Sequence, residues 1–306
     1  MALSPSLEIP EHYRREFAEN WDHNVNQEIQ RLGNRVRVDN WAGKSKVYND
    51  IDEVEWTERT GRLTNSTLTE VTGKAREAVK RDFKCQVVFD QVDDDFLGML
   101  GQPDSEVQEE MRRAWNRKVD TLVALACDQT EYGGAESYTD AIDLPSSQQV
   151  GVQFGESPAA NIGMTPAKLE EAVRILETYD IFCDEEEIAV AMGPAEKRDL
   201  LQYLKTATNE VWANMIGAWH EGKEKKLYGM DVIITNRLQH SSSTDIATCF
   251  VYSKERGLIV VPDDMKIKFD ERPDLDHAIQ ISAYSKYCVL RRFEKTVVTI
   301  ACDRSP

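Results

Sequence analysis

Few residues in this chain have both the type and the spacing that a catalytic or nucleotide site requires. Gly43-Lys44-Ser45 is like the end of a phosphate-binding loop, but that loop needs a glycine five positions before Gly43, where Val38 stands. His220 and Glu221 could form an acid–base pair, yet sequence neighbours on a helix do not face each other. We therefore predict no catalytic residue and no nucleotide site.

The acidic runs and the cysteines do not have the pattern of a metal site. Asp93-Asp94-Asp95 and Asp263-Asp264 could attract divalent cations, but hard-cation loops place their ligands at alternating positions. The six cysteines stand singly, without the close pairs of zinc sites or disulfide frameworks. They are Cys85, Cys127, Cys183, Cys249, Cys288 and Cys302. We expect small buried thiols, solvated acidic loop ends, and neither a metal nor a cofactor.

Composition indicates a soluble protein of one to three compact units. The chain has 306 residues, of which 41% are hydrophobic and 30% are charged. No apolar run approaches the roughly 20 residues that span a bilayer, and residues 1–10 lack a secretory signal. Because the net charge is -17, we do not expect tight binding to a polyanion such as nucleic acid.

Charge is also unevenly placed along the chain. Between Asp90 and Glu110 there are many acidic residues and no Lys or Arg, whereas Arg59 to Lys84 has an excess of basic residues. Opposite patches of this kind can pair between copies of a chain, since complementary potentials guide association. The alternative is that each patch is an ordinary solvated surface.

The last fifth of the chain reads as strands joined by turns. Apolar residues alternate with polar ones in Met265 to Phe269 and again in Ile279 to Ala283, as in strands with one covered face. Proline and aspartate at 261–264 and 271–274 predict turns. Val297 to Cys302 is apolar or small throughout, which predicts a strand covered on both faces.

Helices are expected in the middle of the chain. Pro103, Asp104 and Ser105 predict the start of a helix over 104–128, whose apolar residues mark one face over some 20 residues, about 30 Å at the α-helical rise. Its apolar face comprises Val107, Met111, Trp115, Val119, Leu122 and Ala126. The elements predicted after it are a helix from Thr165-Pro166 to Tyr179, a strand Ile188–Met192, helices Gly193–Leu204 and Asn209–Trp219, and a strand Asp231–Thr235.

The first ninety residues predict two projecting segments. Tyr13, Phe17 and Trp21 at helical spacing suggest a partly helical N-terminal arm. Lys44 to Gly73 is polar and rich in threonine, and the alternating strand at Phe83 to Phe89 favours a β-arm over disorder.

Two tryptophans, Trp41 and Trp56, lie in these polar segments, whereas Trp115 lies on a helix face and is assigned to the core. Aromatic residues are enriched in subunit interfaces, so we predict that Trp41 and Trp56 anchor a neighbouring subunit. The alternative is packing against their own domain.

The order of elements resembles that of the major capsid proteins of tailed bacteriophages, from about Val38 onward. The likeness is carried by GKSKVYNDIDEVEWTERTGRLTNSTL, VQEEMRRAWNRKVDTLVALA, IAVAMGPAEKRDLLQYL, LYGMDVIITNRL and LIVVPDDMKIKFDERPDLDHAIQISAYSKYCVLRRFEKTVVTIACD. The resemblance implies an α+β, Hong Kong 97-like capsid fold. Its parts would be an N-terminal arm (1–42), an extended E-loop (43–90), a P-domain (91–159) with a spine helix (104–128), an A-domain (160–262) and return strands of the P-domain (263–306).

The resemblance also implies a structural function without enzymatic activity. Members assemble as pentamers and hexamers into an icosahedral shell around double-stranded DNA, so the chain would be made in the bacterial cytoplasm and end in the virion. Expected partners are further copies, a separate scaffolding protein, a portal and, optionally, a decoration protein. The candidate intersubunit residues are Trp41, Lys44, Lys46, Trp56, Arg59 and Arg62. The alternatives are an encapsulin-like nanocompartment shell and, more remotely, a carboxylate or metal-dependent hydrolase.

Overall fold

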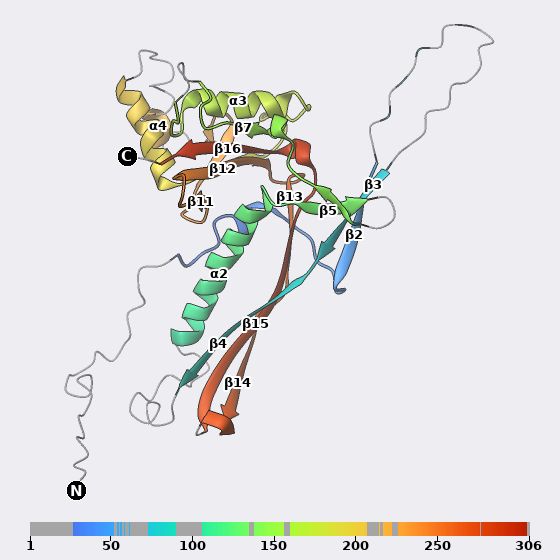
Figure 1. Ribbon diagram of the computed structural model, residues 1–306, viewed down its shortest axis with the longest axis vertical. Helices are drawn as coiled ribbons and strands as arrows, with labels where there is room; N and C mark the ends of the chain where they lie inside the picture. Colours follow the sequence, from blue (N-terminus) through green and yellow to red (C-terminus); the bar gives the residue numbers. More distant parts are fainter. Residues whose placement is uncertain are drawn as a thin grey trace.

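The computed structural model describes residues 27–51, 54, 56, 58, 61, 73–89, 106–134, 138–155, 160–206, 214, 217–221, 226–275 and 277–304. The molecule is an elongated α+β structure in which three sheets meet (Figure 1). One sheet and two helices form a broad end, a long sheet with helix α2 (Glu106–Ala126) extends from it, and a small sheet that contains a β-hairpin adjoins the long sheet. No helix in the described part of the chain has the length and apolar character needed to cross a membrane.

The broad end is built on a seven-stranded sheet of order β7-β16-β12-β8-β10-β9, with β11 beside β12. At its centre β8 has five residues that are all fully or almost fully buried, as expected of a strand covered on both faces. The strands are β7 (Gln149–Val150), β8 (Ile188–Met192), β9 (Lys226–Leu227), β10 (Met230–Ile234), β11 (Gln239–Ser241), β12 (Ile246–Ser253) and β16 (Val297–Asp303).

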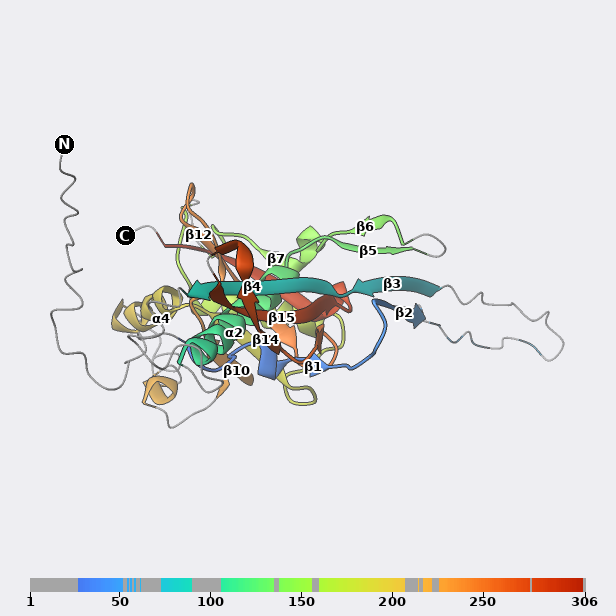
Figure 2. The same cartoon turned by 90° about the horizontal axis from the view of Figure 1, so that it is seen from below.

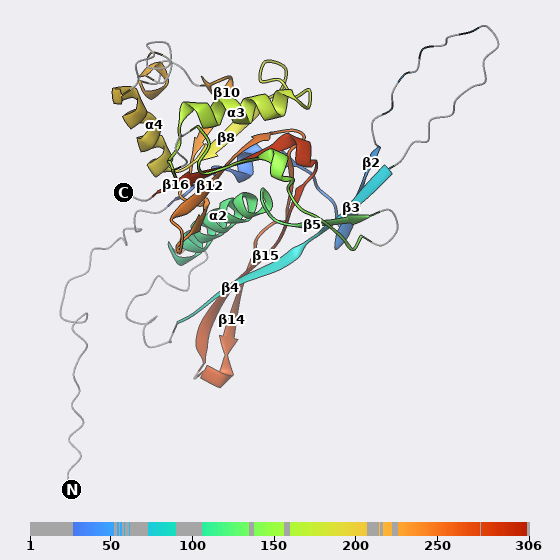
Figure 3. The ribbon, with the colours of Figure 1, turned by 45° about the horizontal axis from the view of Figure 1, so that its top comes forward.

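Two helices pack on this sheet (Figure 3). Helix α3 (Pro166–Glu177) begins as predicted, because the Thr165 side chain accepts a hydrogen bond from Lys168 N at 3.4 Å and proline occupies the first turn. Helix α4 (Pro194–Thr206) also begins where the sequence predicts. Leu169 and Leu176 of α3 are fully buried, so this helix contributes directly to the main core.

The long sheet is organised around β15 (Ala278–Arg291). On one side β15 pairs first with β14 (Lys266–Arg272) and then with β13 (Leu258–Pro262), and on the other side it pairs with β4 (Arg81–Phe89). The two-residue strand β1 (Arg37–Val38) pairs in parallel with β13. Strands β13 and β14 share one edge of β15, and the non-strand residues 263–265 separate them.

Helix α2 covers one face of the long sheet, and its predicted apolar face is confirmed. Met111 packs with Ile281 and Ala283, and the Trp115 ring lies 5.5 Å from Phe83 and 5.9 Å from Tyr287. The predicted start of this helix at Pro103 to Ser105 lies outside the described residues.

The small sheet has the order β2-β3-β5-β6 and carries the hairpin. Its strands are β2 (Ser45–Ile51), β3 (Gly73–Val79), β5 (Glu131–Gly134) and β6 (Asp140–Ile142). Only Lys80 separates β3 from β4, and the two strands run on as one extended line (Figure 2). We call β2, β3 and the chain that links them the arm.

Three groupings predicted from the sequence differ from the observed pairing. The strand at 83–89 exists, but as part of β4 it pairs with β15 and not with the outgoing arm strand. The segment 263–306 is divided, because β14 and β15 join the long sheet while β16 pairs with β12 in the broad end. Strand β13, predicted as part of the 160–262 unit, also lies in the long sheet. The alternation of apolar and polar residues predicts a strand, but it does not indicate which other strand it pairs with.

Some other expectations are only partly tested. Cys127, Cys249, Cys288 and Cys302 are buried as expected, Cys183 is half-buried, and Cys85 is exposed on β4. Of the helix predicted at Asn209–Trp219, only Asn214 and 217–219 are described, and these are helical. The N-terminal aromatic residues 13, 17 and 21 and the acidic run 93–95 lie outside the described residues.

Candidate functional site

The arm exposes three apolar side chains, wholly or in large part. The exposed fraction is 78% for Ile51, 49% for Val54 and 100% for Trp56. Removing such surface from water is favourable, so exposed apolar residues gathered on a projection indicate a contact with another molecule. Trp56, which is expected to be an intersubunit anchor, is fully exposed, and its role between subunits stays a prediction.

Trp41 is placed differently, because it packs within its own chain. With Tyr48 it lies against a small core cluster made of Ala78, Ile259, Val261, Cys288 and Leu290. The Lys80 ammonium lies 4.8 Å from the centre of the Trp41 ring and donates to the Trp41 carbonyl at 2.7 Å. The alternative weighed for Trp41, packing against its own domain, is therefore what the structure has, and a role between subunits stays a prediction.

The predicted contact lysines lie at the root of the arm. Lys46 Nζ donates to Asp39 Oδ2 at 2.6 Å and lies 4.9 Å from the centre of the Tyr48 ring. Hydrogen bonds from Lys46 and then Tyr48 hold the pKa of the Asp39 carboxyl below its usual value. Lys44 is exposed, and its carbonyl accepts from Lys80 N at 2.9 Å. Arg59 and Arg62 lie outside the described residues.

Some basic residues of the segment 59–84 form ion pairs and hydrogen bonds within the chain, at the base of the arm. Arg76 of β3 forms a bidentate pair with Glu294, with atoms 2.5 and 2.6 Å apart, and also donates to the Arg291 carbonyl at 2.9 Å. Arg292 lies 2.5 Å from Asp50 of β2. These pairs tie both arm strands to the chain that follows β15.

A fully buried arginine continues this network into the body. The Arg291 guanidinium donates to the carbonyls of Cys127 at 3.1 Å, Gln129 at 2.8 Å and Ile142 at 2.9 Å. Its backbone N–H donates to Glu131 Oε1 at 3.2 Å. The end of α2, the small sheet and β15 are thereby held together at one point, so the direction of the arm is fixed relative to the spine of the molecule.

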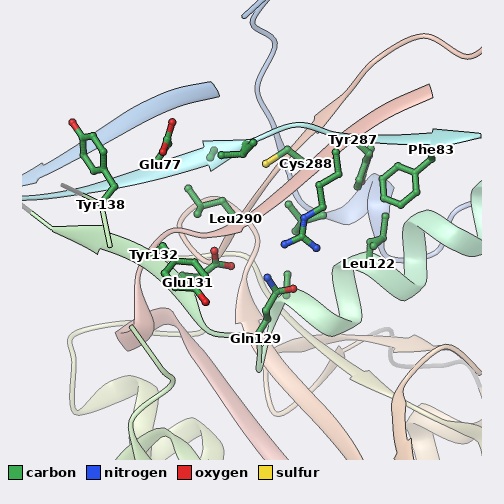
Figure 4. A pocket seen from close by; sticks show the side chains of 15 residues that line it. Glu77, Phe83, Leu122, Gln129, Glu131, Tyr132, Tyr138, Tyr287, Cys288 and Leu290 are labelled. Atoms are coloured by element: carbon green, nitrogen blue, oxygen red, sulfur yellow. The ribbon is translucent and has the colours of Figure 1, made fainter. Parts of the chain in front are cut away.

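A cavity of about 280 Å³ lies beside this junction, between β3, β5, β15 and the end of α2. Figure 4 shows Glu131, Gln129 and Leu290 among the side chains that line it. Burial raises the pKa of the Glu131 carboxyl to about 7, although hydrogen bonding and charge from Arg291 act in the opposite direction. Among the described residues, no group of three His, Cys, Asp or Glu side chains is placed to hold a metal ion. The cavity and its lining residues therefore belong to the contact between the arm and the rest of the chain.

A second anchor, which the sequence reading missed, joins the start of the described chain to α2. Asp120 is fully buried, and its carboxylate accepts from the backbone N–H groups of Arg31 at 2.8 Å, Leu32 at 3.0 Å and Gly33 at 3.1 Å, and from the Gln27 side chain. Glycine at position 33 suits this close approach, because a Cβ would lie 2.6 Å from Gln30 Oε1 and 2.8 Å from Val119 Cγ1. The sequence contained one signal for this anchor: Asp120 directly follows Val119, a residue of the predicted apolar face of the helix.

The comparisons with known proteins decide the family. A family profile described as "Phage capsid protein" matches residues 9–304. The chain belongs to the phage capsid protein family. It is thus a structural major capsid protein of a phage head shell, and it self-associates as a component of the virion.

Solved capsid structures share the fold of this capsid protein at low sequence identity. The capsid of cyanophage P-SCSP1u is 16% identical, with a TM-score of 0.67 over 95% of this chain and 93% of that chain. The capsid of Ralstonia phage GP4 is 9% identical, with a TM-score of 0.65 over 100% and 99%. The capsid of cyanophage Pam1 is 10% identical, with a TM-score of 0.66 over 99% and 98%. A search of curated proteins found no match. The predicted α+β, Hong Kong 97-like capsid fold is confirmed.

Proposed function

We propose that this capsid protein assembles as pentamers and hexamers into an icosahedral head shell that encloses the double-stranded DNA of a tailed phage. The observation that carries the proposal is the exposed apolar surface of the arm, at Ile51, Val54 and Trp56, on a chain of the capsid family. A projection of this kind buries little apolar surface by itself and gains contacts only when it lies across another copy.

The junction at the base of the arm fits this role. The arm is fixed to the rest of the chain by the Arg76–Glu294 and Arg292–Asp50 pairs and by the buried Arg291. The position of a docked arm is therefore fixed relative to the spine helix. A contact made by a segment that is already held in place loses less conformational entropy on binding than one made by a free segment, and this advantage applies to the arm strands β2 and β3.

Further partners follow from the family likeness. We propose a separate scaffolding protein and a portal during assembly in the host bacterial cytoplasm, an optional decoration protein on the finished shell, and DNA held inside without sequence-specific contacts. The division of the chain into arm, E-loop, P-domain and A-domain is part of the same proposal, with β13 placed in the long sheet and β16 in the sheet of the broad end. The overall charge of -17 agrees with a container that does not adhere tightly to the genome.

The test is expression of the full chain with its scaffolding protein, followed by sedimentation and electron microscopy. We expect closed shells of uniform size that contain rings of five and six copies. Soluble monomers without shells, over a range of protein and salt concentrations, would contradict the proposal.

A further inference from the structure

Two buried thiols, which lie more than fifty positions apart in the sequence, come together in the broad end of the molecule. Cys249 of β12 and Cys302 of β16 are fully buried, and their strands lie side by side (Figure 1). The register places Cys302 opposite Ala247, two residues before Cys249, so both side chains point to the same face of the sheet. The Cys249 thiol also forms a hydrogen bond with the Cys302 side chain. The two sulfur atoms are therefore close neighbours.

A third sulfur atom lies beside this pair. Met164, the residue before the cap of α3, is 1% exposed, and its Sδ lies 4.0 Å from Cys302 Sγ. We call Cys249, Cys302 and Met164 the sulfur cluster. Its members come from β12, β16 and the start of α3, so a ligand that joins the three sulfur atoms also joins these three elements.

The geometry of the sulfur cluster suits a metal ion better than a disulfide. Residues that lie diagonally across an antiparallel pair, as Cys249 and Cys302 do, have Cα atoms about 7–8 Å apart, whereas a disulfide requires at most about 6.8 Å. A metal ion spans a wider gap because it lies between the sulfur atoms. With metal–sulfur bonds of about 2.3 Å, a trigonal ion holds its ligands about 4.0 Å apart, which agrees with the distance between Met164 Sδ and Cys302 Sγ.

The ligands and their surroundings indicate which metal would bind. Thiolate and thioether sulfur are soft ligands that favour Cu(I) over hard cations such as Mg²⁺ and Ca²⁺. Two thiolates and one Cu(I) carry one net negative charge, which needs a nearby cation in a buried site. Lys168 supplies this cation: it is fully buried, it donates to the carbonyls of Ile162 at 2.9 Å and Ala301 at 2.8 Å, and its charge acts on both thiols. Arg304 also acts on both thiols, although Glu196 pairs with it at 2.6 Å.

We propose that the sulfur cluster binds one Cu(I) ion, with Cys249 and Cys302 as thiolate ligands and Met164 as a thioether ligand. Each thiol loses its proton as its bond to the metal forms, so two protons leave per ion and the copper stays monovalent. The ion ties the last strand of the chain, β16, to β12 and to the start of α3. Because it binds the folded state, it should stabilise the broad end, and this property is separate from shell assembly.

Copper binding by the purified full chain tests the site. Cu(I) is added without oxygen to the folded protein and, in a parallel sample, during refolding from urea, since the sulfur cluster is buried. The retained copper is counted after competition with a Cu(I) chelator, and X-ray absorption gives the number and distance of the sulfur ligands. We expect one ion per chain with three sulfur neighbours at about 2.3 Å, and a higher thermal midpoint than that of the copper-free protein.

Three variants remove the ligands one at a time. Cys249→Ala and Cys302→Ala should each weaken copper binding by more than about a hundredfold, which exceeds the 10–100-fold effect typical of losing a group that only supports a ligand. Met164→Leu conserves side-chain volume and should lower the number of sulfur neighbours from three to two.

Two cysteines outside the sulfur cluster provide matched controls. Cys85→Ala removes an exposed thiol, which lines a pocket with Met111 and Met265, and Cys288→Ala removes a buried thiol of another core cluster. Both variants should retain the ion. Thermal unfolding without copper shows whether each variant folds.

Several results would overturn the proposal. Copper retained by both Cys249→Ala and Cys302→Ala, or lost in Cys85→Ala, would place the ion elsewhere in the chain. A wild-type protein that binds no copper in either sample would also refute the site. If the two alanine variants do not fold, the comparison of the wild type with Met164→Leu decides: a fall from three sulfur neighbours to two supports the site, and an unchanged number overturns it.

Discussion

Replacing Asp120 should separate the start of the described chain from helix α2. In Asp120→Ala the backbone N–H groups of Leu32 and Gly33 lose their acceptor, and both residues are buried. An orphaned buried donor costs about 1–3 kcal/mol, so two of them should lower the free energy of unfolding by about 4 kcal/mol. Since whole domains are stable by only about 5–15 kcal/mol, the loss should be large.

The amide variant refines this prediction. Asp120→Asn keeps one oxygen as the acceptor for the backbone N–H groups of Leu32 and Gly33. It places an NH₂ group next to Arg31 N, which in the wild type lies 2.8 Å from the carboxylate. We expect about half of the alanine effect, because only one side of the group remains an acceptor. Arg112→Ala, at an exposed position of the same helix, is the matched control and should change stability by less than about 0.5 kcal/mol.

The assay is urea unfolding of the purified subunit followed by circular dichroism, together with hydrogen exchange at Leu32 and Gly33. Exchange at these two amides should accelerate strongly in Asp120→Ala even where α2 stays protected. If Asp120→Ala unfolds within about 0.5 kcal/mol of the wild type, the carboxylate does not hold this segment and the reasoning is wrong.

Three other predictions concern the arm and its base. Arg76→Ala leaves Glu294 without its bidentate partner, so chemical unfolding should show a loss of about 3–5 kcal/mol, and a much smaller loss would mean that the pair is exposed in solution. The folded-state pKa of Glu131 is raised to about 7 from an ordinary 4.5, so its favourable contribution is present below about pH 4.5 and is lost as the pH rises through 7. Glu131→Gln should therefore match the wild type in thermal midpoint at pH 4.5 and exceed it at pH 8, and equal midpoints at both would refute the assignment. Trp56→Ala should reduce shell yield without changing the unfolding of the subunit, since the side chain is fully exposed, and equal loss of both would contradict a role between copies.

Elements with a strong local signal could be predicted from the sequence. The apolar face of α2, the Thr165 cap of α3 and the unbroken apolar run of β8 each depend on neighbours within a few residues. The same is true of β16, where the apolar run from Val297 to Cys302 is buried except at the half-buried Ala301.

The partners of these elements could not be predicted, because they depend on residues far apart in the chain. Nothing near Arg291 and Arg292, two adjacent arginines, indicates that the first is fully buried and the second pairs with Asp50, more than two hundred positions earlier. The cradle around Asp120 likewise joins residues almost ninety positions apart. Among the expected contact residues, Trp56 is exposed on the arm, whereas Trp41 is held in a core that forms only when β13 and β15 come together.

Electron cryomicroscopy of shells formed by the full chain tests the central claim most directly. We predict closed icosahedral particles in which the arm of each copy, with Trp56, lies across a neighbouring copy. Particles in which the arms contact no other subunit, or a protein that stays monomeric, would contradict the account.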